Sequence, residues 1–432
     1  MGFFSRSVET MPREHLQAYQ LEKVRHVLTQ IYGRNRFYTD RLTQVGATPH
    51  DIQSLADFYR LPFTNKQELI EAQAADPPFG TNATFPESAY TRYHQTSGTT
   101  GEPLRVVDTA ESWEWWGDCW GFVLAGAGLT ATDRLFLPFS FGPFIGFWAA
   151  VLGAKRIGAL LVCGGGHSSL QRLHIMRDLQ ATAMCCTPTY ALRLAEVARE
   201  NNFDLRDIPM RITIHAGEPG ANVPATKARI QEAWQAKCFD HAGASEVGAH
   251  SFECEVQPGG VHVIESEFIV EVIDTQTGQA VAEGETGELV ITTLGRIGYP
   301  VIRYRTGDLV KFTTKRCDCG RTFGRFQGGV IGRTDDMVII RGVNVYPSAV
   351  ENLVRQFGAV DEFRVQIAIH REMAEINLEI ELVDGADGEG MCRELQQAFH
   401  HSLGLRPNVT AVPRDSLPRF ELKAKRFYLI GD

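Results

Sequence analysis

The chain has 432 residues, of which 44% are hydrophobic and 22% are charged, and its formal net charge is −9. This length favours two or three domains over a single core, and this composition argues against global disorder. The acidic balance argues against nucleic acid as a general partner, although local loops and helix N-termini can still bind an anionic cofactor.

The first residues, MGFFSRSVETMPREHLQ, contain an acidic residue and a proline where the apolar core of a signal peptide would lie. The nine cysteines are an odd number, and most of them lie in apolar segments. We therefore expect a cytoplasmic protein whose thiols are buried or bound to metal rather than joined in disulfides. From Arg13 to Gly33, apolar residues recur at helical spacing, which predicts an opening helix.

One uncharged run, residues 135–154, is long enough to span a bilayer. It is interrupted by Pro138, Gly142, Pro143 and Gly146. We therefore predict a strand, a glycine-rich turn and a buried helix here, and no membrane as a partner.

Between about residues 130 and 250, apolar runs alternate with amphipathic segments. The runs RLFLPFS, ALLVCGGG, TAMCCTP and MRITIHAG are typical of strands, and SSLQRLHIMRDLQ and TYALRLAEVARENN are typical of helices. This alternation predicts parallel βαβ units, with ligands bound at the carboxyl ends of the strands. From about 260 to 315, short apolar runs and turns indicate a β-rich subdomain. From about 334 the pattern predicts a small α+β domain.

Several glycine- and charge-rich stretches follow one another along the chain. They are TSGTTGEP (96–103), HAGASEVG (241–248), RYRTGDL (303–309), GRTDDMVIIRGVNVYP (332–347) and PRFELKAKR (418–426). A glycine- and threonine-rich loop can enclose a phosphate with backbone N–H groups and hydroxyls, yet this one lacks the lysine of a Walker loop. Each stretch alone is weak evidence, because such a loop is more often a plain turn.

In this order and at these spacings, the stretches resemble those of the adenylate-forming enzymes that include acyl- and aryl-CoA ligases, and especially the phenylacetate-CoA ligase-like branch. AGEP (216–219), TGELVITTL (286–294) and PVIRYRTGDL (300–309) extend the resemblance over almost the whole chain. It implies an α/β fold with a large ATP- and acyl-binding domain at 1–332, built from βαβ-type sheets and a β-rich subdomain. A mobile α+β carboxyl-terminal domain at 333–432 would rotate between two half-reactions.

The resemblance also implies roles for individual residues in adenylation, where a carboxylate attacks the α-phosphorus of ATP and pyrophosphate leaves. The loop at 96–101 would hold the triphosphate, and Lys423 would offset charge that builds up at the reacting phosphate. Glu246 would bind Mg²⁺, a hard cation that bridges phosphates, and Asp308 would accept the ribose hydroxyls. Arg333 would lie on the phosphate side.

The catalytic residues implied in this way are Lys423, Glu246 and Arg333. The nucleotide-binding residues, in which Ala216 to Pro219 form the adenine side and Asp335 the hinge, are Thr96, Ser97, Gly98, Thr99, Thr100, Gly101, Ala216, Gly217, Glu218, Pro219, Ser245, Asp308, Arg333 and Asp335.

The expected function is ATP-dependent ligation of an aromatic or similar carboxylic acid to CoA, in which a thiolate attacks the acyl-adenylate and releases AMP. One alternative is transfer of the acyl group to a carrier-protein thiol or an amine. Another is a zinc-stabilised nucleotide-binding protein without ligase activity. Three departures from the family pattern favour the latter: Glu102 where lysine is frequent, Ala242 where an aromatic is common, and Leu422 where glycine is usual. Lys425 lies close to Lys423, and we prefer Lys423 as the catalytic lysine.

A separate set of residues has the chemistry of a metal site. CDCGR supplies Cys317 and Cys319, and ECEVQPGGVHV supplies Cys254 and His262. Three thiolates and an imidazole would form a closed set suited to structural Zn²⁺, in a β subdomain at about 250–325. The alternative is a hairpin with two solvent-facing thiols and a surface histidine. For the assembly, the family resemblance favours a homodimer.

Overall fold

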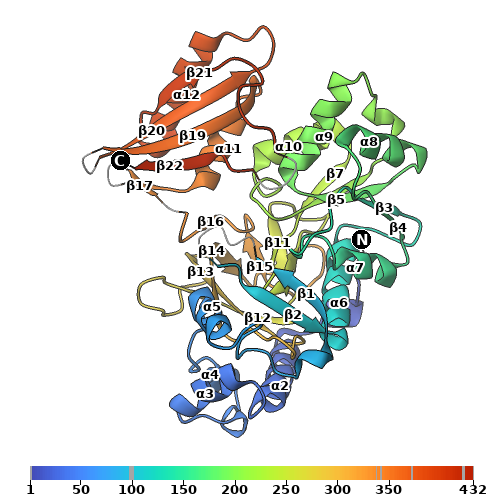
Figure 1. The fold of residues 1–432 in the computed structure, drawn as a ribbon, viewed down its shortest axis with the longest axis vertical. Coiled ribbons are helices and arrows are strands. Elements are labelled where there is room, and N and C mark those ends of the chain that lie inside the picture. The colour runs from blue at the N-terminus through green and yellow to red at the C-terminus, as the bar shows by residue number, and fades with distance from the viewer. Residues whose placement is uncertain are drawn as a thin grey trace.

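The structure, a computed structural model, describes residues 2–96, 102–336, 338–340, 343–370, 373–420 and 424–431. Helices open the chain, parallel and antiparallel sheets form its middle, and an α+β unit closes it (Figure 1). This is the α/β architecture that the sequence predicts.

The opening helices pack against the β-rich middle of the chain. They are α1 (Arg6–Glu9), α2 (Arg13–Ile31), α3 (Arg36–Gln44), α4 (Leu55–Phe58) and α5 (Lys66–Ala75). α2 is the helix predicted from apolar spacing, and it buries Val24, Leu28 and Ile31 against Ile269 and Ile302. This packing attaches the start of the chain to strands that lie far along it.

A parallel sheet confirms the alternation between 130 and 250. Its strands pair in the order β4-β3-β5-β6-β7. The elements are α6 (Ala110–Gly126), β3 (Arg134–Leu137), α7 (Ala150–Ile157), β4 (Leu160–Cys163), α8 (Ser169–Asp178), β5 (Ala183–Cys186), α9 (Pro188–Glu200), β6 (Ile212–His215), α10 (Pro224–Trp234) and β7 (Lys237–Asp240). The run at 135–154 forms β3, a turn and α7 as predicted. Within the described residues, no helix is both long and apolar enough to cross a bilayer.

Antiparallel strands surround this sheet. The hairpin of β1 (Tyr90–Gln95) and β2 (Arg105–Thr109) brackets the predicted phosphate loop. A larger sheet has the order β10-β11-β15-β14-β13-β12, with β16 beside β14, and a small hairpin is formed by β8 and β9. The bounds are β8 (Gly243–Ala244), β9 (Gly248–Ala249), β10 (Ser251–Phe252), β11 (Gly260–Val263), β12 (Phe268–Ile273), β13 (Thr286–Thr293), β14 (Tyr304–Thr313), β15 (Arg325–Gln327) and β16 (Gly332–Arg333).

The carboxyl-terminal unit, drawn in orange to red in Figure 1, lies beside α9 and α10. Its sheet has the order β21-β20-β19-β22, and its apolar core is separate from those of the rest of the chain. The elements are β17 (Val338–Ile340), β18 (Val343–Val345), α11 (Pro347–Arg355), β19 (Val360–His370), β20 (Met373–Leu382), α12 (Gly388–Leu403), β21 (Asn408–Ala411) and β22 (Phe427–Gly431). The exact domain boundary at 332/333 stays a prediction.

Candidate functional site

Two of the predicted nucleotide-binding segments follow the carboxyl ends of neighbouring parallel strands. β6 ends just before the 216–219 segment, and β7 ends just before the 241–246 segment. β14 carries Asp308, which pairs in register with Arg333 of β16. Because carboxyl ends of parallel strands meet at one edge, the 216–219 and 241–246 segments lie together where α/β proteins bind ligands. The antiparallel strand β14 reaches them through the hydrogen bond from Tyr304 to Glu246.

Two predicted parts of the site, Ser97 to Gly101 and Lys423, lie outside the described residues. Thr96, where the loop begins, is described and buried. Its hydroxyl oxygen accepts from the Leu104 N–H at 3.0 Å, and its own N–H donates to the Leu104 carbonyl at 3.0 Å. The β1–β2 hairpin thus holds the two ends of the loop next to each other.

A fully buried ion pair connects this hairpin to the 245–246 turn. The Arg296 guanidinium donates to both oxygens of Asp108 on β2, at 2.7 Å each. Its third group, Nη1, donates to the Ser245 carbonyl at 3.0 Å, and its carbon lies 5.2 Å from the centre of the Trp116 ring. Such a paired, charge-assisted contact fixes orientation as well as distance. Sequence reasoning missed this contact, because the two partners are 188 residues apart.

Glu246, the predicted Mg²⁺ ligand, is buried and held in place. One carboxylate oxygen accepts from the Tyr304 hydroxyl at 2.8 Å. Burial, together with the Glu246 charge, raises the pKa of Tyr304 well above its usual value, so the phenol remains a donor at neutral pH. A fixed carboxylate at this edge has the chemistry that a hard cation requires.

Asp308 and Arg333 form the polar centre of the site. The Arg333 guanidinium donates to Asp308 Oδ1 at 2.8 Å and to both oxygens of Asp335, at 2.9 and 3.1 Å. Burial raises the pKa of Asp308 to about 6, an effect that the Arg333 charge opposes and nearby Glu246 and Asp335 reinforce. One arginine therefore links the predicted ribose ligand to the predicted hinge residue.

Glu218 of the predicted adenine-side segment has an unexpected set of contacts. Gly217 before it adopts φ +96°, a conformation that favours glycine. The Glu218 carboxylate accepts from the Thr189 N–H at 2.9 Å and from the Ala424 N–H at 2.6 Å. The side chain thus contacts two backbone positions that lie far from it in the sequence, and the assignment of the backbone to the adenine side stays a prediction.

The position before Ala242 does not supply the missing aromatic. His241 is buried, its Nδ1 lies 2.6 Å from the Ser251 carbonyl, and its ring packs edge-on against Trp120 with centroids 4.7 Å apart. Burial lowers the pKa of His241 to about 4, so the imidazole is neutral at pH 7. His241 therefore packs against Trp120 of α6.

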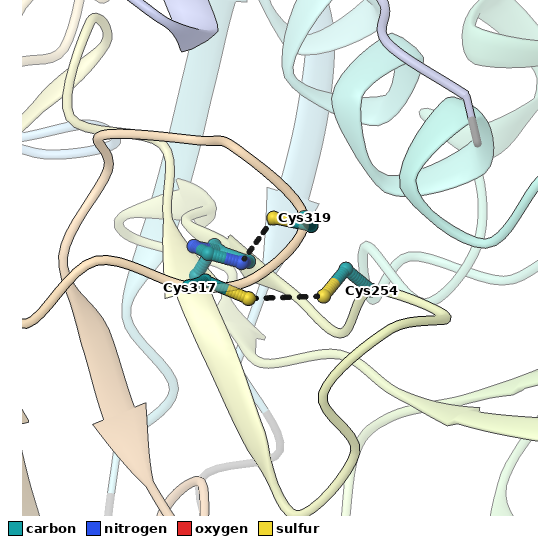
Figure 2. A group of neighbouring side chains, drawn as sticks. Cys254, Cys317 and Cys319 are labelled. Atoms are coloured by element: carbon teal, nitrogen blue, oxygen red, sulfur yellow. Dashed lines mark hydrogen bonds between the residues drawn. The ribbon is translucent and has the colours of Figure 1, made fainter.

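The four predicted metal ligands come together in the β-rich region. Their ligand atoms all lie within 4.8 Å of one another, and all four residues are buried. Figure 2 shows the labelled cysteines with their sulfurs pointing toward one another. The Cys254 and Cys317 sulfurs are 3.7 Å apart, and Cys319 Sγ lies 3.4 Å from His262 Nε2. The alternative of solvent-facing thiols and a surface histidine is wrong.

The surroundings of the cluster orient its histidine. His262 Nδ1 lies 3.1 Å from the Phe323 carbonyl, which leaves Nε2 directed at the cysteines. A backbone carbonyl on the second ring nitrogen is the usual arrangement around a metal-binding histidine. Contacts with Cys254 and His262 lower the pKa of the Cys319 thiol, which favours the thiolate that binds metal.

Comparison with known proteins gives a consistent result. Residues 17–295 match the sequence profile of AMP-binding enzymes, and residues 342–428 match that of the AMP-binding enzyme C-terminal domain. A phenylacetate-coenzyme A ligase of Thermus thermophilus is 32% identical over 96% of this chain and 96% of its own length. A phenylacetate-coenzyme A ligase of Escherichia coli K12 is 30% identical over 98% of this chain and 96% of its own.

Solved structures include a relative in two states. The chain is 31% identical to a 2-hydroxyisobutyryl-CoA ligase over 99% of this chain and 92% of that one. The TM-score is 0.93 against that ligase in its postadenylation state with 2-HIB-AMP. It is 0.75 against the same ligase in its thioesterification state with 2-HIB-AMP and CoA.

The raised pKa of Asp308 predicts a pH dependence of nucleotide binding. Because only an ionised carboxylate can accept from both ribose hydroxyls, the predicted ribose-binding role of Asp308 implies that affinity falls as pH drops through about 6. At pH 5 only about a tenth of such a group is ionised, so the Kd for AMP should be roughly tenfold weaker than at pH 8. Isothermal titration calorimetry with AMP measures this, and Asp308→Asn is the control that retains the titration of the phosphate. Equal pH profiles for the two proteins would contradict the prediction.

Proposed function

Because this chain belongs to the AMP-binding enzyme family, we propose that it is an ATP-dependent acid–CoA ligase that works through an acyl-adenylate. The acid first displaces pyrophosphate from ATP, and the thiol of CoA then displaces AMP from the adenylate. The observation that carries the proposal is the convergence of Glu246, which follows β7 of the parallel sheet, with Asp308 and Arg333 on the antiparallel strands β14 and β16.

Each of these groups suits one task in adenylation. Asp308, once ionised, can accept from the ribose hydroxyls, while Arg333 provides positive charge beside the phosphates. Glu246 is the residue that would hold Mg²⁺, which would neutralise phosphate charge. The acid needs no general base because it is already ionised at pH 7. The reaction therefore depends on positioning and charge neutralisation.

The acid is the finer part of the proposal. The curated relatives are named for phenylacetate, which supports an aromatic acid for this chain. The 2-hydroxyisobutyryl-CoA ligase has a similar sequence identity to this chain, 31%, and is named for a small aliphatic hydroxy acid. The turn after β3 packs Phe139 edge-on against Phe141, Phe144 and Phe147, with centroids 5.1 to 5.7 Å apart. This aromatic cluster at a strand end favours the aromatic acid.

We also propose that Cys254, His262, Cys317 and Cys319 hold one structural Zn²⁺. Three sulfurs and one imidazole nitrogen make the closed, four-ligand set typical of structural zinc, and burial keeps the cluster from solvent. The nearby hairpin is tied to the start of the chain, because the buried Arg321 pairs with Glu9 and donates to the Gly2 carbonyl. Zinc would therefore stabilise the junction between α1 and the β-rich sheet.

The compartment and the assembly remain predictions. All nine cysteines are free, which fits a reducing cytoplasm. The homodimer rests on the family resemblance, and light scattering after gel filtration measures it.

Assays of AMP release with a panel of aryl and short-chain acids, with and without CoA, test the proposed reaction. AMP release should require an acid, ATP and Mg²⁺, and should produce thioester only when CoA is added. Phenylacetate and other aryl acids should exceed 2-hydroxyisobutyrate in kcat/KM. Transfer of the acyl group to an amine or a carrier thiol in place of CoA, with release of AMP, would favour the alternative acceptor, and no turnover with any acid would contradict the ligase.

Lys423 should act in the first step only. Lys423→Ala should lower acid-dependent ATP–pyrophosphate exchange by about a hundredfold or more, because one cation aimed at developing charge contributes on this scale. Thioester formation from supplied acyl-adenylate and CoA should persist. Lys425→Ala is the matched control, since Lys425 is exposed and two residues away. Equal loss in both steps would refute this division.

The metal proposal predicts about one zinc per chain in purified protein. Cys319→Ser should remove it and lower Tm by roughly 5 °C or more, given that one kcal/mol corresponds to a few degrees in chains of this size. Cys163→Ser, at the exposed thiol, should retain both zinc and Tm. Mass spectrometry of metals and calorimetry measure the two quantities. Metal-free wild-type protein of unchanged stability would defeat the proposal.

A further inference from the structure

The Glu218 carboxylate connects the large region of the chain to Ala424, the residue after the predicted catalytic Lys423. One oxygen accepts from the N–H of Thr189, in the first turn of α9, and the other accepts from the N–H of Ala424. Ala424 directly follows Lys423, so the bound N–H belongs to the peptide group that joins the two residues. Glu218 therefore binds the backbone of the residue that directly follows Lys423 in the sequence.

Arg426 attaches the same segment two residues later. It is buried, and it donates to both oxygens of Glu362 on β19, at 2.7 and 2.9 Å. Its Nη1 also lies 3.4 Å from Thr189 Oγ1. The Arg426 carbonyl accepts from the Val365 N–H at 2.7 Å, where β22 begins to pair with β19. Residues 424 to 426 are thus held between the first turn of α9 and the carboxyl-terminal sheet.

Charge makes the Glu218 contact strong in this position. A carboxylate that accepts from two backbone N–H groups forms charge-assisted hydrogen bonds, which are stronger than neutral ones. One of the two donors also belongs to the first turn of a helix, where negative charge is favoured. The contact can stabilise only an arrangement of the two regions that places Ala424 beside α9, and a contact specific to one arrangement shifts the population toward it.

The whole chain has the arrangement that superposes more closely on the postadenylation state of its relative than on the thioesterification state. We propose that Glu218 is a positioning residue for adenylation, whose side chain holds residues 424–426, which directly follow the predicted catalytic Lys423 in the sequence, against α9. This inference rests on the proposed function, because it assigns Glu218 to the first of the two half-reactions.

Half-reaction kinetics test the proposal. Glu218→Ala should lower kcat for ATP–pyrophosphate exchange by about tenfold or more, with KM for ATP within about twofold. Thioester formation from supplied acyl-adenylate and CoA should stay within about twofold of wild type. Glu218→Gln keeps one acceptor oxygen and should fall between wild type and Glu218→Ala. Equal loss in both half-reactions, or a change confined to KM for ATP, would overturn the proposal.

Glu196→Ala is the matched control. Glu196, on α9, is like Glu218 an acidic residue that faces the carboxyl-terminal unit, but its carboxylate lies 3.9 Å from Arg419 and accepts from neither the Thr189 nor the Ala424 N–H. Its variant should leave both half-reactions within about twofold. A loss equal to that of Glu218→Ala would assign the effect to acidic charge on this face in general.

Limited trypsin digestion separates failure of this inference from failure of the proposed function. It needs no turnover, and Lys425 provides an exposed cleavage site next to the contact. Glu218→Ala should be cut there several times faster than wild type, with Tm unchanged within about 2 °C. An unchanged rate of cleavage would overturn the positioning role, whether or not the enzyme ligates any acid that is tested.

Discussion

The buried ion pair between Asp108 and Arg296 is the contact on which the geometry of the site depends. It joins β2, which follows the predicted phosphate loop, to the carbonyl of Ser245, next to the predicted Mg²⁺ ligand. Loss of one partner would leave an uncompensated charge in the interior, which typically destabilises a protein by about 3–5 kcal/mol. The ion pair therefore holds the β1–β2 hairpin and the 245–246 turn in one mutual orientation. This constraint fixes the position of Glu246.

The contacts between the two regions differ in kind from this pair. Ala424 is bound through its N–H, and Arg229 donates to the Val360 carbonyl at 3.2 Å. Arg419 approaches Glu196 at 3.9 Å. These contacts are polar: the contact of Glu218 with Ala424 is charge-assisted and is the strongest of them, and water can solvate the groups of each contact when the two regions separate. Rigid contacts thus lie within the nucleotide-binding region, and exchangeable ones lie between the regions, as an enzyme with two half-reactions requires.

Local patterns predicted the elements of this fold well. Apolar periodicity predicted α2 and the βαβ alternation, and Pro347 lies at the first position of α11, where proline is favoured. The order of strands in the parallel sheet and the contacts of Glu218 lay beyond sequence reasoning. The Ala424 N–H is 206 residues from Glu218, and only the closed fold brings the two together.

The candidate site was predictable to a different degree in each part. The resemblance identified Glu246, Asp308 and Arg333, and the structure adds which groups hold them. Cysteine and histidine spacing suggested the metal cluster, whose proximity and burial the structure supplies, while the metal itself stays a prediction. The contact between Asp108 and Arg296 had no local signal, because neither residue belongs to a recognisable motif and the fold alone makes them neighbours.

The use of a backbone N–H by Glu218 has an evolutionary consequence. A carboxylate that binds a main-chain donor is indifferent to the side chain at that position, so residue 424 can drift freely among amino acids without disturbing the contact. Proline is the exception, since it has no N–H to offer. Selection for this contact would thus exclude proline at residue 424 and leave the choice among the other side chains open.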